Sequence, residues 1–189
     1  MQYKIIRSQR KTLAIEIRNA EILVRAPQRA SDDAVDRFVE KHRAWIEQKL
    51  RIAKERIDRA DAEAPLSADD LRALALRAGR VLPERVAYYA ERIGVNYRRI
   101  TIRKQKSKWG SCSAKGNLNF NCLWMLAPPA VQDAIVVHEL CHLKEMNHSA
   151  AFWREVARVC PDYRASEAWL KQNGWVLMRR MQNGVQKAE

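Results

Sequence analysis

This chain of 189 residues lacks long hydrophobic runs and paired cysteines, and both absences exclude classes of protein. No stretch approaches the roughly 18 uninterrupted apolar residues of a membrane-spanning helix. The first residues also lack the apolar core of a signal peptide, so we expect a cytoplasmic protein with no membrane partner. The cysteines form no Cys-x-x-Cys pair, which argues against a disulfide framework or a thiolate zinc site; they are Cys112, Cys122, Cys141 and Cys160.

Histidine is also scarce, yet three of the four histidines lie close together, at positions 138, 142 and 148. The first two belong to the sequence His-Glu-Leu-Cys-His. Because a helix turns by about 100° per residue, His138 and His142 lie one turn apart on one face, with Glu139 beside them. Two metal ligands and a general base on one helix are the zincin pattern, so we expect a catalytic zinc ion here.

His148 can reach the same metal only if the helix ends before it, because a continuing helix would carry it about 15 Å along the axis from His138. We expect the break at Asn147, since asparagine tolerates the left-handed conformation that ends many helices. Metzincins have a glycine at the bend where this chain has Glu145, so we do not expect a metzincin. Three histidines would leave one open position on the zinc, although such sites also accept nickel, cobalt or manganese.

The net charge of +13 favours a polyanionic partner, since summed positive charge concentrates anions near the surface. Much of this charge lies on helices that also carry acids. The exception is a basic cluster that leads toward the metal motif and consists of Arg98, Arg99, Arg103, Lys104, Lys106 and Lys108. It has two readings, a functional basic patch or a solvated strand whose lysines deter aggregation.

The sequence pattern of the N-terminal third predicts a β-hairpin and a long helix. Alternating apolar residues indicate strands over 11–17 and 22–24, and Ser31 caps a helix that we expect to run to about residue 60. Residues 61–67 read as a linker, so we divide the chain into an N-terminal appendage, 1–64, and a hydrolase core, 65–189. A second helix, capped by Ser67 or Asp69, should reach residue 93, with a kink or split at Pro83 and a stop at Gly94.

The sequence of the hydrolase core predicts strands over 99–103 and 117–123. In the second strand three asparagines share one face, and we interpret it as the edge strand above the zinc helix, where it would bind an extended substrate. The alternative is that these asparagines merely face water. The zinc helix should begin at Pro128-Pro129, and a last helix should end before Gly174, with Trp153 and Trp169 in the core. The expected fold is therefore α+β: a small mixed sheet with an edge strand over the metal-binding helix.

Several of these segments together resemble the YgjP-like metallopeptidase family, minimal zincins related to the WLM and SprT-like proteases. They are the stretch 106–113, the stretch 116–120, the histidine segments, Phe152-Trp153, and residues 161–163. The resemblance implies that His138, His142 and His148 bind one zinc ion and that Glu139 is the catalytic base. With it we expect substrate contacts from Trp109, Asn117, Asn119 and Asn121.

The leading hypothesis is a zinc metallopeptidase that cleaves extended polypeptides, with Glu139 as general base and Tyr163 as a candidate oxyanion donor. The main alternative is a metal-dependent nucleotide pyrophosphatase, because hydrolysis of UTP is attributed to this family and the basic cluster could hold a triphosphate. A third reading is a DNA-associated protease similar to the SprT-like proteins, although no nucleic-acid-binding motif supports it.

Overall fold

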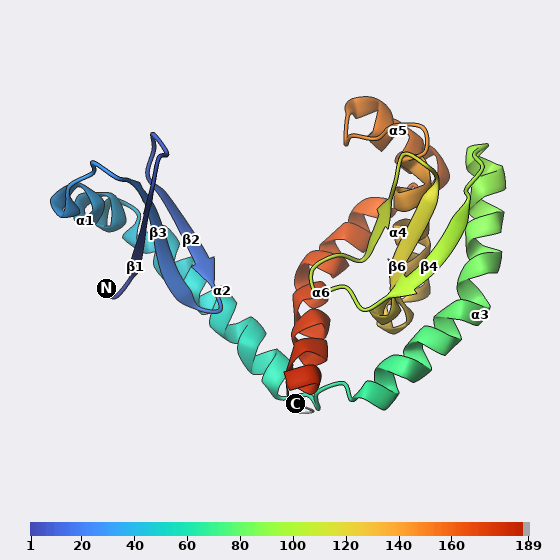
Figure 1. The fold of residues 1–189 in the computed structure, drawn as a ribbon, viewed down its shortest axis with the longest axis horizontal. Coiled ribbons are helices and arrows are strands. Elements are labelled where there is room, and N and C mark those ends of the chain that lie inside the picture. The colour runs from blue at the N-terminus through green and yellow to red at the C-terminus, as the bar shows by residue number, and fades with distance from the viewer. Residues whose placement is uncertain (187–189) are drawn as a thin grey trace. The chain divides into compact units, whose positions relative to one another are not determined.

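The computed structural model describes residues 1–186 (Figure 1). The chain forms two compact units, Met1–Glu63 and a second unit from Ala64 onward, each with its own sheet and its own apolar core. The structure divides the chain after Glu63, one residue before the boundary that we placed after residue 64 from the sequence. Among the described residues, no helix is both long enough and apolar enough to cross a membrane.

The first unit contains a three-stranded sheet of β1 (Lys4–Ser8), β2 (Ala14–Arg18) and β3 (Glu21–Pro27) in the order β1-β3-β2. The predicted hairpin is confirmed, because β2 and β3 pair antiparallel around Asn19 and Ala20, which both have positive φ. Strand β1, which pairs parallel to β3, was not predicted. All its residues are exposed, so no buried face gives it an alternating pattern.

Two helices follow in this unit, α1 (Asp32–Lys41) and α2 (Arg43–Asp61). The prediction of a single helix was wrong, because the backbone of His42 leaves the helical region at φ −107°. The His42 imidazole packs on the Phe38 ring at 4.5 Å, and its Nδ1 lies 2.7 Å from the Phe38 carbonyl oxygen. These local contacts of His42 accompany the break between α1 and α2, which the spacing of apolar residues along the sequence does not reveal.

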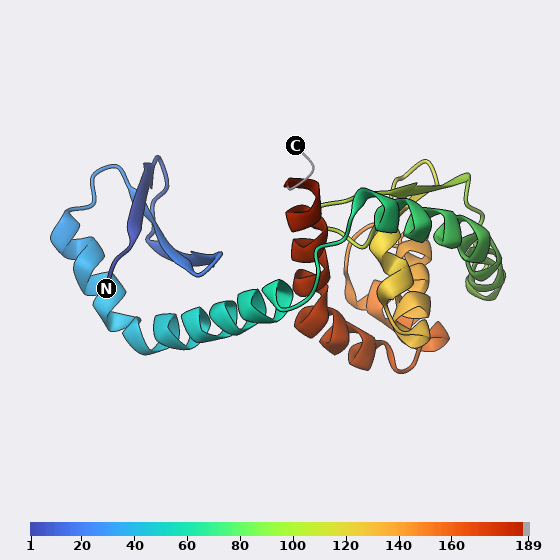
Figure 2. The same ribbon diagram turned by 90° about the horizontal axis from the view of Figure 1, so that it is seen from below.

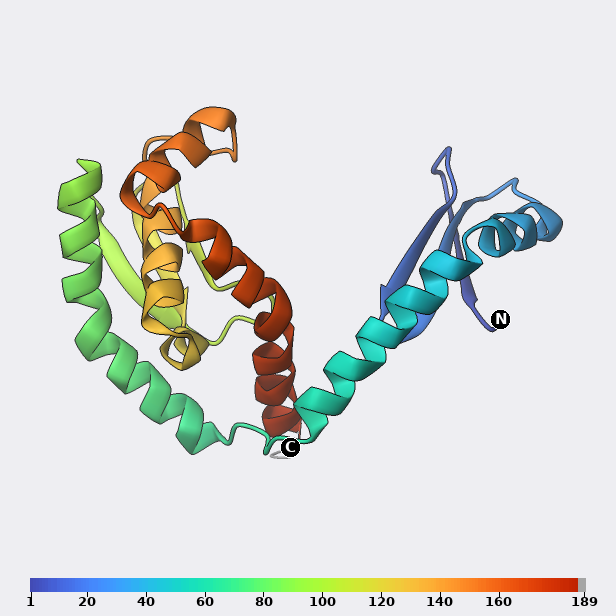
Figure 3. The same cartoon turned by 180° about the vertical axis from the view of Figure 1, so that it is seen from behind.

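The second unit begins with α3 (Ala68–Ile93), which is capped by reciprocal hydrogen bonds between Ser67 and Asp70 and ends at left-handed Gly94. Pro83 does not split the helix, which is continuous and curved (Figures 1 and 3). Next come β4 (Arg99–Arg103), β5 (Gly110–Cys112) and β6 (Asn117–Asn121).

These strands form a second sheet in the order β4-β6-β5, with β6 parallel to β4 and antiparallel to β5. The identification of residues 117–123 as the edge strand was therefore wrong, because β6 is the central strand. The strand beside the helix that carries His138 and His142 is β5. It is too short, and its Gly-Ser-Cys sequence too weakly patterned, to be predicted as a strand.

Four further elements complete the unit: η1 (Cys122–Leu126), α4 (Pro129–Cys141), α5 (Ala150–Val159) and α6 (Tyr163–Gln186). Leu118 and Phe120 of β6 pack into one core with α3, α4 and Phe152 of α5, and Figure 2 shows these helices beneath one face of the sheet. Helix α6 continues through Gly174, where a tail was expected. The predicted class, α+β with a small mixed sheet over the helix of the His-Glu-Leu-Cys-His motif, is confirmed.

Candidate metal centre

The end of α4 brings the three histidines together. The helix ends at Cys141, with His142 as its C-terminal cap, and the chain then turns back through residues 143–148. The break thus comes earlier than the predicted position, Asn147, which does not adopt the left-handed conformation. Instead the Asn147 carboxamide oxygen accepts a hydrogen bond from the backbone of Ser149, the residue that caps α5.

The geometry and chemistry of this cluster fit a divalent metal ion. One nitrogen from each imidazole lies within 4.8 Å of the others, and Nε2 of His138 is 3.1 Å from Nε2 of His148. Tetrahedral zinc, with bonds of about 2.0–2.1 Å, would hold two nitrogens roughly 3.3 Å apart. Nδ1 of His142 lies 3.1 Å from the Glu145 carbonyl oxygen, a backbone contact that orients the ring and leaves Nε2 for a metal.

Burial also keeps two of the three imidazoles in the form that binds metals. It lowers the pKa of His138 to about 4, with further lowering from His142 and His148, and it lowers the pKa of His142. At neutral pH both rings are therefore uncharged, with a free electron pair for a cation.

Aromatic side chains of α5 support the histidines. The Phe152 ring stacks on His142 at 4.6 Å and meets His138 and His148 edge-on at 4.9 Å. Trp153 stacks between His148, at 5.7 Å, and Tyr163, at 5.2 Å. Trp153, expected in the core, is thus partly buried at the site. Its place in the first turn or so of the helix that begins two residues after His148 was a signal that could have indicated this.

Glu139 lies beside the histidines and is almost fully buried, with 6% of its surface exposed. Burial raises the pKa of Glu139 to about 8, which the positive charge of Lys108 partly opposes. A divalent cation at the histidines would lower this pKa further. The backbone of Gly110 in β5 passes directly over the carboxylate, since a Cβ at Gly110 would lie 2.6 Å from Oε1 of Glu139.

A pocket of about 270 Å³ opens beside Glu139 and His138. Its walls are mostly apolar side chains from three helices and from the residue before β5: Trp109, Ala134, Ile135, Trp153, Val156, Tyr163 and Leu170. Two residues proposed from the sequence, Trp109 and Tyr163, therefore lie at the site. The Trp109 indole has room because Gly174 of α6 faces it, where a Cβ would approach Nε1 to 3.0 Å.

The three asparagines of β6 do not face this pocket. Leu118 and Phe120 point into the core beneath the sheet, so the alternating asparagines point to the opposite face. Asn119 bonds to Ser111 and Arg103 on that outer face, which also carries Asn117.

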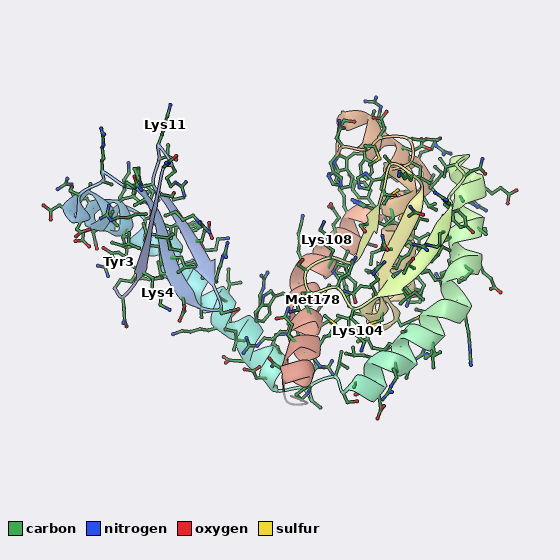
Figure 4. All side chains as sticks on the ribbon, in the orientation of Figure 1. Tyr3, Lys4, Lys11, Lys104, Lys108 and Met178 are labelled. Carbon is green, nitrogen blue, oxygen red and sulfur yellow. The ribbon has the colours of Figure 1, made fainter. Side chains whose placement is uncertain are left out.

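The prediction that Asn121 contacts substrate was wrong, because this residue is fully buried. Its amide nitrogen donates to the carbonyl oxygens of Gln105, at 2.7 Å, and Lys108, at 2.9 Å, and it touches Met178 of α6. Gln105 and Lys108 belong to the loop between β4 and β5. Figure 4 labels Lys104, Lys108 and Met178, where this loop meets α6. Asn121 thus anchors the loop that carries Trp109.

Strand β5 leaves one side open for a further strand. The Trp109 carbonyl accepts from Asn121, and the Ser113 amide donates to Asn117, so these groups face β6. In an antiparallel pair the intervening residues turn their backbone groups the other way. The N–H and C=O groups of Gly110 and Cys112 therefore point to the unpaired edge beside α4.

Comparison with known proteins finds a match to one family model. The model of the YgjP-like metallopeptidase domain matches residues 11–74 and 68–173. Among solved structures, the chain is similar to the metallopeptidase zymogen abylysin of Pyrococcus abyssi, with 26% identity and a TM-score of 0.44 over 50% of this chain and 93% of that one. A search of curated proteins returned no match. Since the family model matches well over half of the sequence, the chain belongs to the YgjP-like metallopeptidase family.

Proposed function

We propose that this protein is a zinc-dependent peptidase that cleaves polypeptides bound in an extended conformation. The observation that carries the proposal is the convergence of three imidazole nitrogens within 4.8 Å beside a buried glutamate and an open strand edge. His138, His142 and His148 would hold the zinc ion, which when bound acidifies water and polarises the scissile carbonyl group.

Glu139 would act as the general base. Its carboxylate accepts a proton from the attacking water and then delivers that proton to the leaving amine, a double role that suits a group with few hydrogen-bond partners of its own. Tyr163 lines the same pocket, and its hydroxyl would donate a hydrogen bond to the developing oxyanion. Stacking on Trp153 would hold the Tyr163 ring in place.

The substrate would add as a strand to the free edge of β5, bonding to the backbone of Gly110 and Cys112. A strand antiparallel to β5 passes Cys112 first, then Gly110 above Glu139, and then residues 108–109. The residue after the scissile bond therefore faces the pocket, whose apolar walls favour an apolar side chain.

The pocket supports a peptide better than a nucleoside triphosphate. Of the six residues of the basic cluster, Lys108 alone lines it, and the other walls offer little to neutralise phosphate charge. A volume of about 270 Å³ suits one side chain and lies below the range usual for drug-sized ligands, roughly 300–1,000 Å³.

The test is hydrolysis by the zinc-loaded protein of peptides that differ only in the residue after one bond, leucine or glycine, with UTP assayed in parallel. We expect cleavage before leucine, and a loss of roughly 10²–10⁴-fold in kcat with zinc retained in Glu139→Gln. UMP and pyrophosphate without peptide cleavage would overturn the proposal.

A matched pair of variants tests whether the side chain after the scissile bond lies in the pocket. Ala134→Leu fills the pocket and should lower the leucine-to-glycine ratio of kcat/KM by about tenfold, the scale of a methylene-sized mismatch. Ala130→Leu makes the same change one turn earlier on α4 at an exposed position and should leave that ratio as it is. Equal ratios in the two variants would place the leucine side chain elsewhere.

A further inference from the structure

The second sheet and its loops carry positively charged side chains and no negatively charged ones. The 39 residues from Gly94 to Gln132 contain no aspartate or glutamate. They contain seven exposed cations, which are the six residues of the basic cluster and Lys115. Within residues 1–186 no carboxylate lies at ion-pair distance from any of these seven, whereas four other cations of this unit pair with acids: Arg72, Arg85, Lys144 and Arg158.

Strand register places two of these cations among polar side chains on one face. Arg99, Thr101 and Arg103 of β4 alternate with Ile100 and Ile102, which pack into the core, so the three point to the outer face. There Arg99 is in register with Asn117 of β6, and Thr101 with Asn119. Figure 2 shows α3 and α4 beneath the sheet and α6 beside it, and none of these helices lies over the outer face of β4.

Hydrogen bonds across the strands orient this face. Arg103 donates through Nε to the Asn119 carboxamide oxygen at 3.1 Å, and Asn119 donates to the Ser111 hydroxyl at 3.3 Å. These bonds hold Arg103 in place while its terminal guanidinium nitrogens stay available for an anion. Arg99 and Arg103 are separated by roughly 13 Å along the strand, at about 3.3 Å per residue.

We propose that this outer sheet face binds the phosphate backbone of double-stranded nucleic acid. Arginine, asparagine, serine and threonine are side chains that hydrogen-bond to phosphate oxygens. The face has no aromatic side chain on which unstacked bases could lie, because Phe120 points into the core and Trp109 lines the pocket, which favours a duplex over a single strand. Binding through phosphates alone is independent of sequence and depends strongly on salt. The proposal is independent of the peptidase function, since Arg99 and Arg103 lie on the face opposite α4.

The test is fluorescence anisotropy with the full chain and a labelled 20-base-pair DNA duplex between 50 and 200 mM NaCl. We expect an affinity that falls linearly with salt on logarithmic axes, and a loss of roughly 10- to 100-fold at 100 mM NaCl in the double variant R99Q/R103Q, since each phosphate contact contributes a slope of about −0.9. The matched control is R72Q/R77Q, which removes the same charge from exposed positions of α3.

Three outcomes would overturn the proposal. Equal losses in the two double variants would show attraction by net charge alone. Tighter binding of the separated single strand would contradict a duplex site. Displacement of the duplex by poly-glutamate at matched charge concentration would identify an acidic polypeptide as the partner of this face.

Discussion

Replacing Gly110 with alanine should disturb the general base, Glu139, without disturbing the three histidines that would bind the metal. A Cβ at this position would lie 2.6 Å from Oε1 and 2.7 Å from Cγ of Glu139, distances that real Cβ atoms essentially never show. The obstructing atoms Cγ, Cδ and Oε1 belong to the Glu139 side chain and not to the backbone, so a rotation of that side chain can relieve the contact while the backbone stays in place. A shift of about half an ångström to one ångström is enough to relieve the contact.

Such a shift should reduce activity and leave metal binding intact, at a moderate cost in the free energy of unfolding. Misplacement of a catalytic group by about 1 Å can lower a rate by roughly 10²-fold. We therefore expect Gly110→Ala to lower kcat for a cleaved peptide by about 10- to 100-fold. Its zinc stoichiometry should equal that of the wild type, and its free energy of unfolding should fall by about 1–3 kcal/mol, the usual cost of an overpacked buried site.

The matched control is Gly79→Ala in α3, where the added Cβ would lie 3.7 Å from Ile102 Cδ1, an ordinary contact. This variant should keep full activity and gain up to about 1 kcal/mol of stability from helix propensity. If Gly110→Ala retained wild-type kcat, the close approach of β5 to Glu139 would have no part in catalysis.

Three further predictions concern other residues of the second unit. Tyr163→Phe should lower kcat by roughly 10²–10³-fold with little change in KM, and a change in KM alone would remove Tyr163 as oxyanion donor. Asn121→Asp replaces a buried donor by an acceptor facing two carbonyl oxygens, so urea denaturation should show a loss of about 3 kcal/mol or more, and a loss below 1 kcal/mol would refute its anchoring role. Arg158 and Lys144 lower the pKa of Glu155 from 4.5 to about 2, so its ion pairs stabilise the fold above pH 4.5 and lose that effect toward pH 2. Glu155→Gln should therefore cost about 1 kcal/mol at pH 7 and progressively less below pH 4.5, whereas a cost that does not vary with pH would contradict the shift.

The sequence predicted the local features of the site better than its tertiary features. Helical spacing placed His138 and His142 on one face with Glu139 beside them, because that relation depends only on the geometry of the helix. The position of the break was missed, since His142 ends α4 through contacts of its own turn and Asn147 keeps an ordinary backbone conformation.

Strand order was the larger failure. A three-residue edge strand has too little sequence to show a pattern, so β6, with its repeated asparagines, was taken for the edge. The anchoring role of Asn121 and the pocket position of Trp153 depend on which segments meet in three dimensions, and no periodicity along the chain encodes that.

The central claim is that three histidines hold one metal ion beside Glu139, and native mass spectrometry after zinc loading tests it most directly. We expect one zinc ion per chain in the wild type and in Glu139→Gln, and none retained in His142→Ala after passage over a chelating resin. A wild-type protein that binds no metal, or a His142→Ala protein that keeps a full equivalent, would contradict the claim.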